Sequence, residues 1–319
     1  MKKYRLILAV AAVMVTAIPV WSYVTKRGLS NTGVIVQARW SPVAFPIPWQ
    51  MNSAVGANVT GSNSQETVFQ NGFATWQALT TANLSFTEAA PVPANVRAGY
   101  DGINLVTTNV TANEYQSGAL GLTLVYSFDQ GGVVDQLARP IDFAGQIMEA
   151  DIMFNPAVAF STNTVTPGDR IDLQSVATHE IGHLLGLDHT TILSATMFPT
   201  LTAGASYARV LSPDDIAGVS TLYPQASFSS KGTISGSVRT TGNTAVYGAI
   251  VTAVNSDGQP VASAVTEPDG RYTIAGLEPG SYTVYAEPLD RPVTLPDLGT
   301  LNVIHPGLPA YTTFITRFH

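Results

Sequence analysis

Three of the five histidines in the 319-residue chain lie within one short stretch, Thr178–Thr191, which reads THEIGHLLGLDHTT. On an α-helix, His179 and His183 would stand one turn apart and project from the same face. Two imidazole nitrogens placed in this way can bind a single zinc ion, which takes histidine nitrogens at about 2.0–2.1 Å. The stretch therefore predicts a helix that carries a metal site.

The third histidine, His189, cannot join that face on a straight helix, because it lies six residues beyond His183. Gly186 stands between them, and glycine accepts the positive φ with which helices commonly end. We expect the helix to stop at Leu185 and the chain to turn at Gly186 toward the metal. Three neutral nitrogens leave one position open, which is typical of catalytic zinc, whereas structural zinc is closed by four protein ligands.

Glu180 directly follows the first histidine and projects to the side of the ligand face. A carboxylate there does not reach the ligand plane, but it can reach a water molecule beside the metal. That position suits a general base, and HExxH on a helix is a known arrangement of two zinc ligands and a base. The extended pattern HExxHxxGxxH fixes five positions, so the motif predicts one catalytic zinc held by His179, His183 and His189.

Composition excludes several classes of protein. The formal charge is −7, and no basic run exists beyond the first five residues, which argues against nucleic acid or an anionic membrane surface as a partner. Charged residues make up only 12% of the chain. The chain has no cysteine, so disulfides, thiolate ligands and cysteine nucleophiles are excluded.

The first residues resemble an export signal. MKKYR is basic, and the apolar run LILAVAAVMVTAIPV has the length of a signal peptide rather than of a comfortable membrane span. We interpret residues 1–23 as a signal peptide or an uncleaved N-terminal anchor. Either reading predicts an exported protein, secreted or periplasmic, with membrane contact only if the segment is retained. The oligomeric state is not predicted.

Helical and strand patterns mix as far as Pro224. Helices are expected over residues 64–80, over residues 172–187 with Asp172 or Asp169 as N-cap, and from Ser212. RWSPVAFPIPWQMN reads as an edge-type strand because of its prolines, and strands are also expected in LSFTE, GINLVTT, ALGLTLVYSF and GQIMEADIMFN. Beyond residue 230 only short β-rich runs alternate with turn pairs, which indicates a β-sandwich. The fold class is therefore α+β followed by an all-β domain.

HEIGHLLGLDH resembles the zinc signature of the metzincin peptidases, and Thr190 is similar to the Ser or Thr that follows it in matrixins, the matrix-metalloproteinase family. FATWQAL, EADIMFN, DLQSVATHE and SPDDIAGVSTLYP extend the resemblance over about residues 34–224. It implies a twisted mixed sheet with long helices, an active-site helix and a methionine turn. SATMFP resembles that turn and places Met197 beneath the metal, while Phe198 departs from the usual tyrosine, so no tyrosine ligand is expected.

The same resemblance implies a substrate site and further cations. The substrate would pair as a strand with the sheet edge at Ala119, Leu120 and Gly121, and a side-chain pocket would be lined by Pro199, Thr200 and Leu201. Calcium is considered at four carboxylates in the region where relatives bind it, although ordinary solvated loop carboxylates explain them equally well: Asp129, Asp135, Glu149 and Asp151. A second, structural zinc is not expected, and no inhibitory prodomain fits between the leader and the catalytic region.

The β-rich part, with DGRY and LEPGSY, resembles carboxypeptidase-regulatory-like domains, which are transthyretin-like sandwiches. We expect a peptidase domain over residues 34–226, this sandwich over 231–290 and a strand-like tail over 291–319. Three functions remain open: an exported zinc endopeptidase acting on polypeptides, a binding or adhesion protein that uses the peptidase fold as a scaffold, and a metal-dependent hydrolase of another bond. The intact Glu180 opposes the scaffold, and the resemblance in the sheet edge and the methionine turn opposes the third.

Overall fold

One twisted sheet organises the first two thirds of the protein. The computed structural model describes residues 25–289, 293–312 and 314–318, so the leader expected at residues 1–23 lies outside the described residues. Five strands pair in parallel, and β8 pairs antiparallel with the other side of β11. The sheet order is β3 (Arg39–Trp40), β11 (Gln146–Phe154), β7 (Leu105–Thr107), β4 (Ile47–Met51) and β6 (Phe86–Glu88), with β8 (Gly121–Ser127) beside β11.

The three predicted helices are confirmed as α1 (Gln65–Gln77), α2 (Leu173–Leu184) and α3 (Pro213–Leu222). Each begins after a residue whose side chain accepts a hydrogen bond from a backbone N–H of the first turn, which satisfies a donor that has no partner inside the helix. These N-caps are Ser64, Asp172 and Ser212. Among the residues that the structure describes, no helix is long and apolar enough to cross a membrane.

Aromatic side chains fix α1 and α2 to the sheet. The ring of Phe73 stacks on Trp49 of β4 with centroids 4.5 Å apart, and Phe69 stacks on Phe154 of β11 at 5.4 Å. Trp76 is fully buried, and its indole Nε1 donates to the carbonyl of Thr178 on α2 at 2.8 Å. The helix that carries the histidines is therefore held through both packing and a buried hydrogen bond.

The prediction that RWSPVAFPIPWQMN forms one edge strand holds for β3, which ends the sheet order, and is wrong for β4. β4 lies inside the sheet, between β6 and β7. Pro48 is tolerated because neither neighbouring strand needs its N–H. On one side, β4 bonds to the β6 segment through the N–H of Ile47 and the carbonyl of Trp49; on the other side, β7 pairs with β4 only from Gln50 onward. The missing N–H of proline thus falls where no partner strand needs it.

Short strands and 3-10 turns complete the catalytic part. The two-stranded sheets are β1 (Arg27–Leu29) with β2 (Ile35–Gln37), and β9 (Val133–Val134) with β10 (Pro140–Ile141); a three-stranded one joins β5 (Val59–Thr60), β12 (Phe160–Ser161) and β13 (Ile171–Asp172). The 3-10 turns are η1 (Pro42–Ala44), η2 (Tyr207–Arg209) and η3 (Ala226–Ser230).

Beyond residue 230 the predicted β-rich runs form two facing sheets. One pairs β14 (Gly232–Ser237) with β17 (Arg271–Leu277), and the other has the order β16 (Pro260–Val265), β15 (Ala249–Val254), β18 (Thr283–Pro288) and β19 (Arg317–Phe318). Val251, Ala253 and Ile274 are buried between them. The interior is thus a small apolar core of the kind that a sandwich requires.

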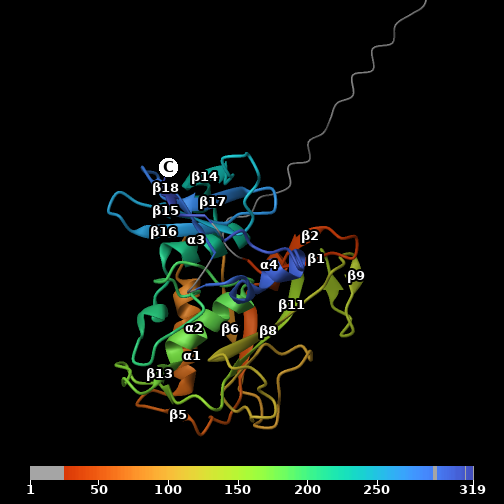
Figure 1. Ribbon diagram of the computed structural model, residues 1–319. Helices are drawn as coiled ribbons and strands as arrows, with labels where there is room; N and C mark the ends of the chain where they lie inside the picture. Colours follow the sequence, from red (N-terminus) through yellow and green to blue (C-terminus); the bar gives the residue numbers. More distant parts are fainter. Residues whose placement is uncertain (1–24, 290–292, 313, 319) are drawn as a thin grey trace, which may run out of the picture.

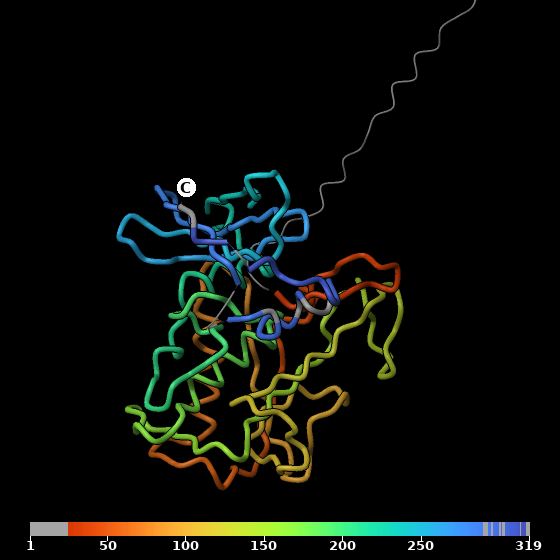
Figure 2. The backbone as a smooth tube through the Cα atoms, in the orientation of Figure 1, coloured from red at the N-terminus to blue at the C-terminus, as the bar shows by residue number. Residues whose placement is uncertain are grey.

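The tail over residues 291–319 differs from the strand-like expectation. It contains the 3-10 turn η4 (Leu295–Asp297) and the short helix α4 (Gly299–Ile304), and among its described residues only β19 is a strand. Leu298, Leu301 and Ile304 are buried at a spacing of three, which suits a helical turn rather than the alternation of a strand. Figure 2 shows this stretch running back from the sandwich toward the catalytic part.

The sandwich rests directly on α3, and Figure 1 shows β16 above that helix. Ala217 of α3 packs into the sandwich core, and a Cβ on Gly276 would lie only 2.7 Å from the Ala217 side chain, so glycine permits the close approach. Asp214, also on α3, accepts a hydrogen bond at 2.8 Å from the backbone N–H of Ser263 on β16. Burial raises the pKa of Asp214 to about 7.

The raised pKa of Asp214 predicts that the stability of the protein depends on pH. Because its pKa in the folded protein lies above that of an unfolded aspartate, the unfolding free energy should fall as the pH rises from about 4 to about 7. Asp214→Asn keeps an acceptor for Ser263 and removes the ionisation, so its unfolding free energy should change less over this range. Urea unfolding at pH 4.5, 6 and 7.5 measures the difference; equal pH slopes in both proteins would contradict the assignment.

Candidate functional site

Helix α2 carries the first two histidines and ends as the sequence predicts. Leu185 is the C-cap and Gly186 follows with φ 93°. The N–H of Gly186 donates to His183 O, and the N–H of Leu187 donates to Gly182 O, both at 3.0 Å. This is the paired bonding of a Schellman turn. A Cβ at Gly186 would lie 2.3 Å from the carbonyl oxygen of Ala38, so both backbone conformation and space require glycine.

The turn brings His189 beside the two helical histidines. Ligand atoms of the three rings lie within 4.8 Å of one another, and His179 Nε2 is 3.2 Å from His183 Nε2. Two histidine nitrogens bound to one tetrahedral zinc would be about 3.4 Å apart. Within residues 25–289, 293–312 and 314–318, these three side chains form the one group of His, Asp or Glu residues suited to a metal ion.

The opposite nitrogen of each ring faces a backbone carbonyl. His179 Nδ1 donates to Thr196 O at 2.7 Å, and His183 Nδ1 donates to Leu187 O at 2.9 Å. His189 Nδ1 donates to Asp297 O at 2.6 Å. Because a carbonyl only accepts, each Nδ1 must hold the proton, and each Nε2 in the neutral ring presents a lone pair. The donor set fits zinc, since converging lone pairs repel one another unless a cation lies between them.

Burial keeps the helical ligands neutral. Desolvation lowers the pKa of His179 to about 3 and that of His183 well below its ordinary value. Proximity of the other histidines acts in the same direction, because a second positive ring nearby is unfavourable. Neither ring is therefore protonated near neutral pH, which is the state that binds a metal.

Met197 lies beneath α2 and is 2% exposed. A Cβ at Gly182 would lie 2.2 Å from its sulfur, so glycine on the helix makes room for the methionine. The backbone N–H groups of Thr196 and Met197 both donate to the carboxylate of Asp215, at 2.8 and 3.0 Å. Asp215 also completes a capping box with Ser212 at the start of α3. One buried carboxylate thus fixes the carbonyl that orients His179.

The carboxylate of Glu180 contacts β8. Its Oε2 accepts a hydrogen bond from the Thr123 hydroxyl at 2.7 Å, while its Oε1 lies against Gly121, where a Cβ would be only 2.5 Å away. Burial raises the pKa of Glu180 to about 7, although the Thr123 hydrogen bond opposes the shift. A carboxylate with such a pKa can both accept and release a proton near neutral pH.

A cleft of about 520 Å³ joins these groups. Its lining contains the three histidines and Glu180, the residues predicted for the sheet edge, and those predicted for the side-chain pocket: Ala119, Leu120, Gly121, Pro199, Thr200 and Leu201. The carbonyls of Ala119 and Leu120 already accept hydrogen bonds from Asn155. Because backbone groups alternate along an antiparallel strand, Gly121 then presents its own N–H and C=O to the open side of β8.

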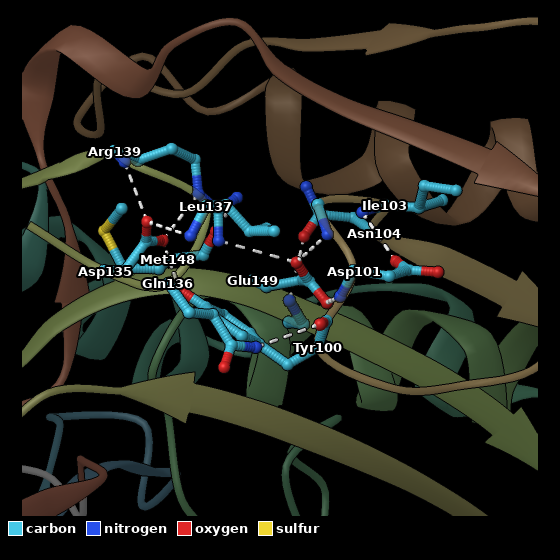
Figure 3. A network of polar contacts seen from close by, with 12 residues as sticks. Tyr100, Asp101, Ile103, Asn104, Asp135, Gln136, Leu137, Arg139, Met148 and Glu149 are labelled. Carbon is cyan, nitrogen blue, oxygen red and sulfur yellow. Dashed lines mark hydrogen bonds and ion pairs between the residues drawn. The ribbon is translucent and has the colours of Figure 1, made fainter.

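The four carboxylates considered for calcium do not form one site. Asp135 accepts hydrogen bonds from Arg139 and from the Tyr100 hydroxyl, and Glu149 accepts from two backbone N–H groups and lies 3.6 Å from Arg139 (Figure 3). Asp151 accepts from two other backbone N–H groups, and Asp129 is exposed.

Burial and hydrogen bonding shift the pKa values of these carboxylates in opposite directions. It raises the pKa of Glu149, and raises that of Asp151 to about 7. Burial also acts to raise the pKa of Asp135, but the hydrogen bonds from Tyr100 and Arg139 outweigh it and hold the value at about 2. An arginine and backbone donors thus occupy the positions around these carboxylates that a cation would need.

Sequence reasoning missed several residues of the site. Thr123 and Asp215 act through contacts between distant segments, although the S-P-D-D run from Ser212 indicated the cap that uses Asp215. Pro296, Asp297 and Gly299 also line the cleft, more than 100 residues after the histidines, and no pattern in the sequence pointed to them. Phe198, expected not to be a ligand, is buried in an apolar cluster.

Comparisons with known protein families agree with this arrangement. Residues 40–224 match the family model described as Matrixin, and residues 233–292 match the one described as Carboxypeptidase regulatory-like domain. The matrixin match covers the main sheet, the three long helices and all three histidines.

Curated relatives match shorter stretches. Metalloendoproteinase 1 of Glycine max is 37% identical over 99 residues, which cover 31% of each chain. Metalloendoproteinase 5-MMP of Arabidopsis thaliana is 51% identical over 53 residues, covering 17% of this chain and 14% of the relative. Matrilysin of Rattus norvegicus is 50% identical over 48 residues, covering 15% and 18%. The chain thus spans less than a third of the length of each of these relatives.

The contacts of Arg139 predict that its removal lowers the stability of the folded protein. Arg139→Ala removes the positive charge beside the fully buried Glu149 and leaves Asp135 with the Tyr100 hydroxyl as its side-chain donor. We expect a loss of about 2–4 kcal/mol of unfolding free energy, less than for a fully buried pair because Arg139 retains some contact with water. Urea unfolding measures it, and Arg139→Lys, which keeps the charge, should lose less. An alanine variant as stable as the wild type would show that the carboxylates need no cation.

Proposed function

Because the chain belongs to the matrixin family, we propose that it is a zinc-dependent endopeptidase. The observation that carries the proposal is the convergence of three histidine Nε2 atoms beside a buried Glu180 in one open cleft. Three protein ligands with an open side suit catalysis, whereas a structural site would be closed by a fourth. The proposal favours peptide-bond hydrolysis over a scaffold role.

His179, His183 and His189 would hold the zinc through Nε2, since each Nδ1 is engaged with a carbonyl. Zinc bound there would polarise the scissile carbonyl and increase the acidity of water. The three Nδ1 hydrogen bonds keep the rings in one tautomer and one orientation, which stabilises the ligand geometry.

Glu180 acts as the general base. Its Oε2 is held by Thr123, so its Oε1, beside Gly121, is the atom that takes the proton of the attacking water. The same oxygen then gives the proton to the leaving amine, which departs neutral. A pKa near 7 suits both transfers, because the group is neither too weak a base nor too weak an acid.

The substrate is an extended polypeptide. β8 pairs with β11 on one side, and Gly121 presents its backbone groups on the other, so a peptide can add to this edge as a further strand. A side chain of the peptide would enter beside Pro199, Thr200 and Leu201. Gly121 has two roles: its backbone groups are available to the peptide, and its lack of a side chain leaves room for Glu180.

The proposal places the catalytic unit in residues 34–226 and the sandwich in residues 231–290, and it treats the protein as exported on residues 1–23. It includes no calcium, because three of the four carboxylates considered for it, Asp135, Glu149 and Asp151, already accept hydrogen bonds from arginine or backbone donors. It includes no nucleic acid partner, in keeping with the formal charge of −7.

Glu180→Gln tests the chemistry. The amide keeps the shape of the carboxylate but cannot take a proton, so kcat on unfolded casein or a peptide library should fall about 100- to 10,000-fold. Zinc content should stay at one ion per chain, as measured by atomic emission. A zinc chelator should abolish cleavage by the wild type, and added zinc should restore it.

Wild-type protein that retains one zinc per chain but cleaves no peptide would exclude the peptidase proposal and favour the scaffold. His189→Ala provides a second measurement, because loss of one ligand should weaken zinc binding strongly. If that variant binds zinc as tightly as the wild type, the assignment of three histidine ligands is wrong.

Export has its own test. We expect the protein outside the cytoplasm of the producing cell, and N-terminal sequencing of that fraction distinguishes a cleaved leader from a retained anchor. Protein found solely in the cytoplasm would contradict the proposed location without affecting the proposed chemistry.

A further inference from the structure

Residues 293–304, here called the C-terminal strap, run back from the sandwich toward the catalytic part (Figure 2). Pro296, Asp297 and Gly299 of the strap line the same cleft as the three histidines. Its helix α4 lies next to β1 of the catalytic part (Figure 1). The strap therefore belongs to the surroundings of the metal site, although it follows the sandwich in sequence.

An apolar cluster anchors the strap. Leu298 and Leu301, 0% and 1% exposed, pack in one cluster with Phe198, the residue after the methionine of the turn. Ile250 and Val265 of the sandwich belong to the same cluster. The aromatic ring at position 198 thus connects the methionine turn, the strap and the sandwich, which gives Phe198 a packing role.

A turn fixes the backbone of Asp297. The N–H and the hydroxyl of Thr294 donate to Asp297 Oδ2 at 2.8 and 2.7 Å, and the N–H of Asp297 donates back to Thr294 O at 3.0 Å. The carbonyl of Asp297 then points to His189, with its oxygen 2.6 Å from Nδ1. The side chain of Asp297 orders the turn, and its backbone contacts the histidine.

The other two histidines find their carbonyls within the catalytic part. His183 uses Leu187, four residues further on, and His179 uses Thr196 of the methionine turn. His189 alone depends on a residue 108 positions away, beyond the sandwich. The strap supplies the acceptor of His189 Nδ1, so without the strap this ring would lose the bond that sets its tautomer.

We propose that the C-terminal strap is a working part of the active site. Asp297 is a positioning residue whose carbonyl orients His189 for zinc, and Pro296 and Gly299 form one wall of the substrate cleft. This inference rests on the proposed zinc centre. Groups that orient a metal-bound histidine commonly contribute 10- to 100-fold to metal affinity, so the effect should be measurable.

Full-length Asp297→Ala tests the positioning role against Asp297→Asn, which retains an acceptor for Thr294. Competition with a chromophoric chelator gives the zinc dissociation constant, and the visible spectrum of the cobalt-substituted protein reports ligand geometry. We expect Asp297→Ala to bind zinc about 10- to 100-fold more weakly and to shift the cobalt bands. Asp297→Asn and Leu308→Ala, whose side chain is 42% exposed on the tail, should resemble the wild type.

Leu298→Asp provides a second variant, because an isolated carboxylate cannot remain in the apolar cluster and should displace the strap. The melting temperature of this variant shows whether the rest of the protein stays folded. If the variant unfolds, the result for Asp297→Ala alone tests the positioning role. A zinc dissociation constant within twofold of wild type, with an unchanged cobalt spectrum in both variants, would overturn the positioning role. A wild type that binds no zinc would instead refute the proposed function.

Substitution of Gly299 tests whether the strap forms a wall of the substrate cleft. A Cβ there would meet no atom within 4 Å, so the backbone has room for a side chain, and Gly299→Trp adds a large ring at the cleft. We expect KM for an extended peptide to rise at least tenfold, with the zinc dissociation constant unchanged. An unchanged KM would show that substrate does not pass this wall.

Discussion

The active site depends on three histidine Nε2 atoms that converge on one point. In each histidine a backbone carbonyl accepts the hydrogen bond of Nδ1, which leaves Nε2 to face the metal site, and each carbonyl is fixed by a different device. Asp215 holds the carbonyl that serves His179, the turn at Gly186 holds the one for His183, and the C-terminal strap supplies the one for His189. Much of the surrounding fold is explained by the need to hold these acceptors still.

Burial acts in opposite directions on neighbouring groups of the site. It lowers the pKa of His179 and raises that of Glu180, because in each case water no longer stabilises the charged form. The same desolvation thus yields neutral ligands and a base that titrates near neutral pH. Gly121 and Gly182 make this dense packing feasible, since a side chain at either would collide with Glu180 or Met197.

Local features were predictable from the sequence, and contacts between distant segments were not. Caps such as Asp172 and the turn at Gly186 depend on a few neighbouring residues, so their patterns identify them. The position of β4 inside the sheet depends on which strands flank Pro48, and the strap depends on packing across two domains. The histidine motif predicted the ligands but not Asp297, because a backbone carbonyl leaves no signature in a sequence.

The distance along the chain between His189 and Asp297 also imposes an order on biosynthesis. Ribosomes add about 5–20 residues per second, so the 108 positions between the two residues take roughly 5–20 s to appear. During that interval the first two histidines can already be in place on their helix, whereas the third has no carbonyl to orient it. The carbonyl that orients His189 therefore becomes available only after the sandwich has been made.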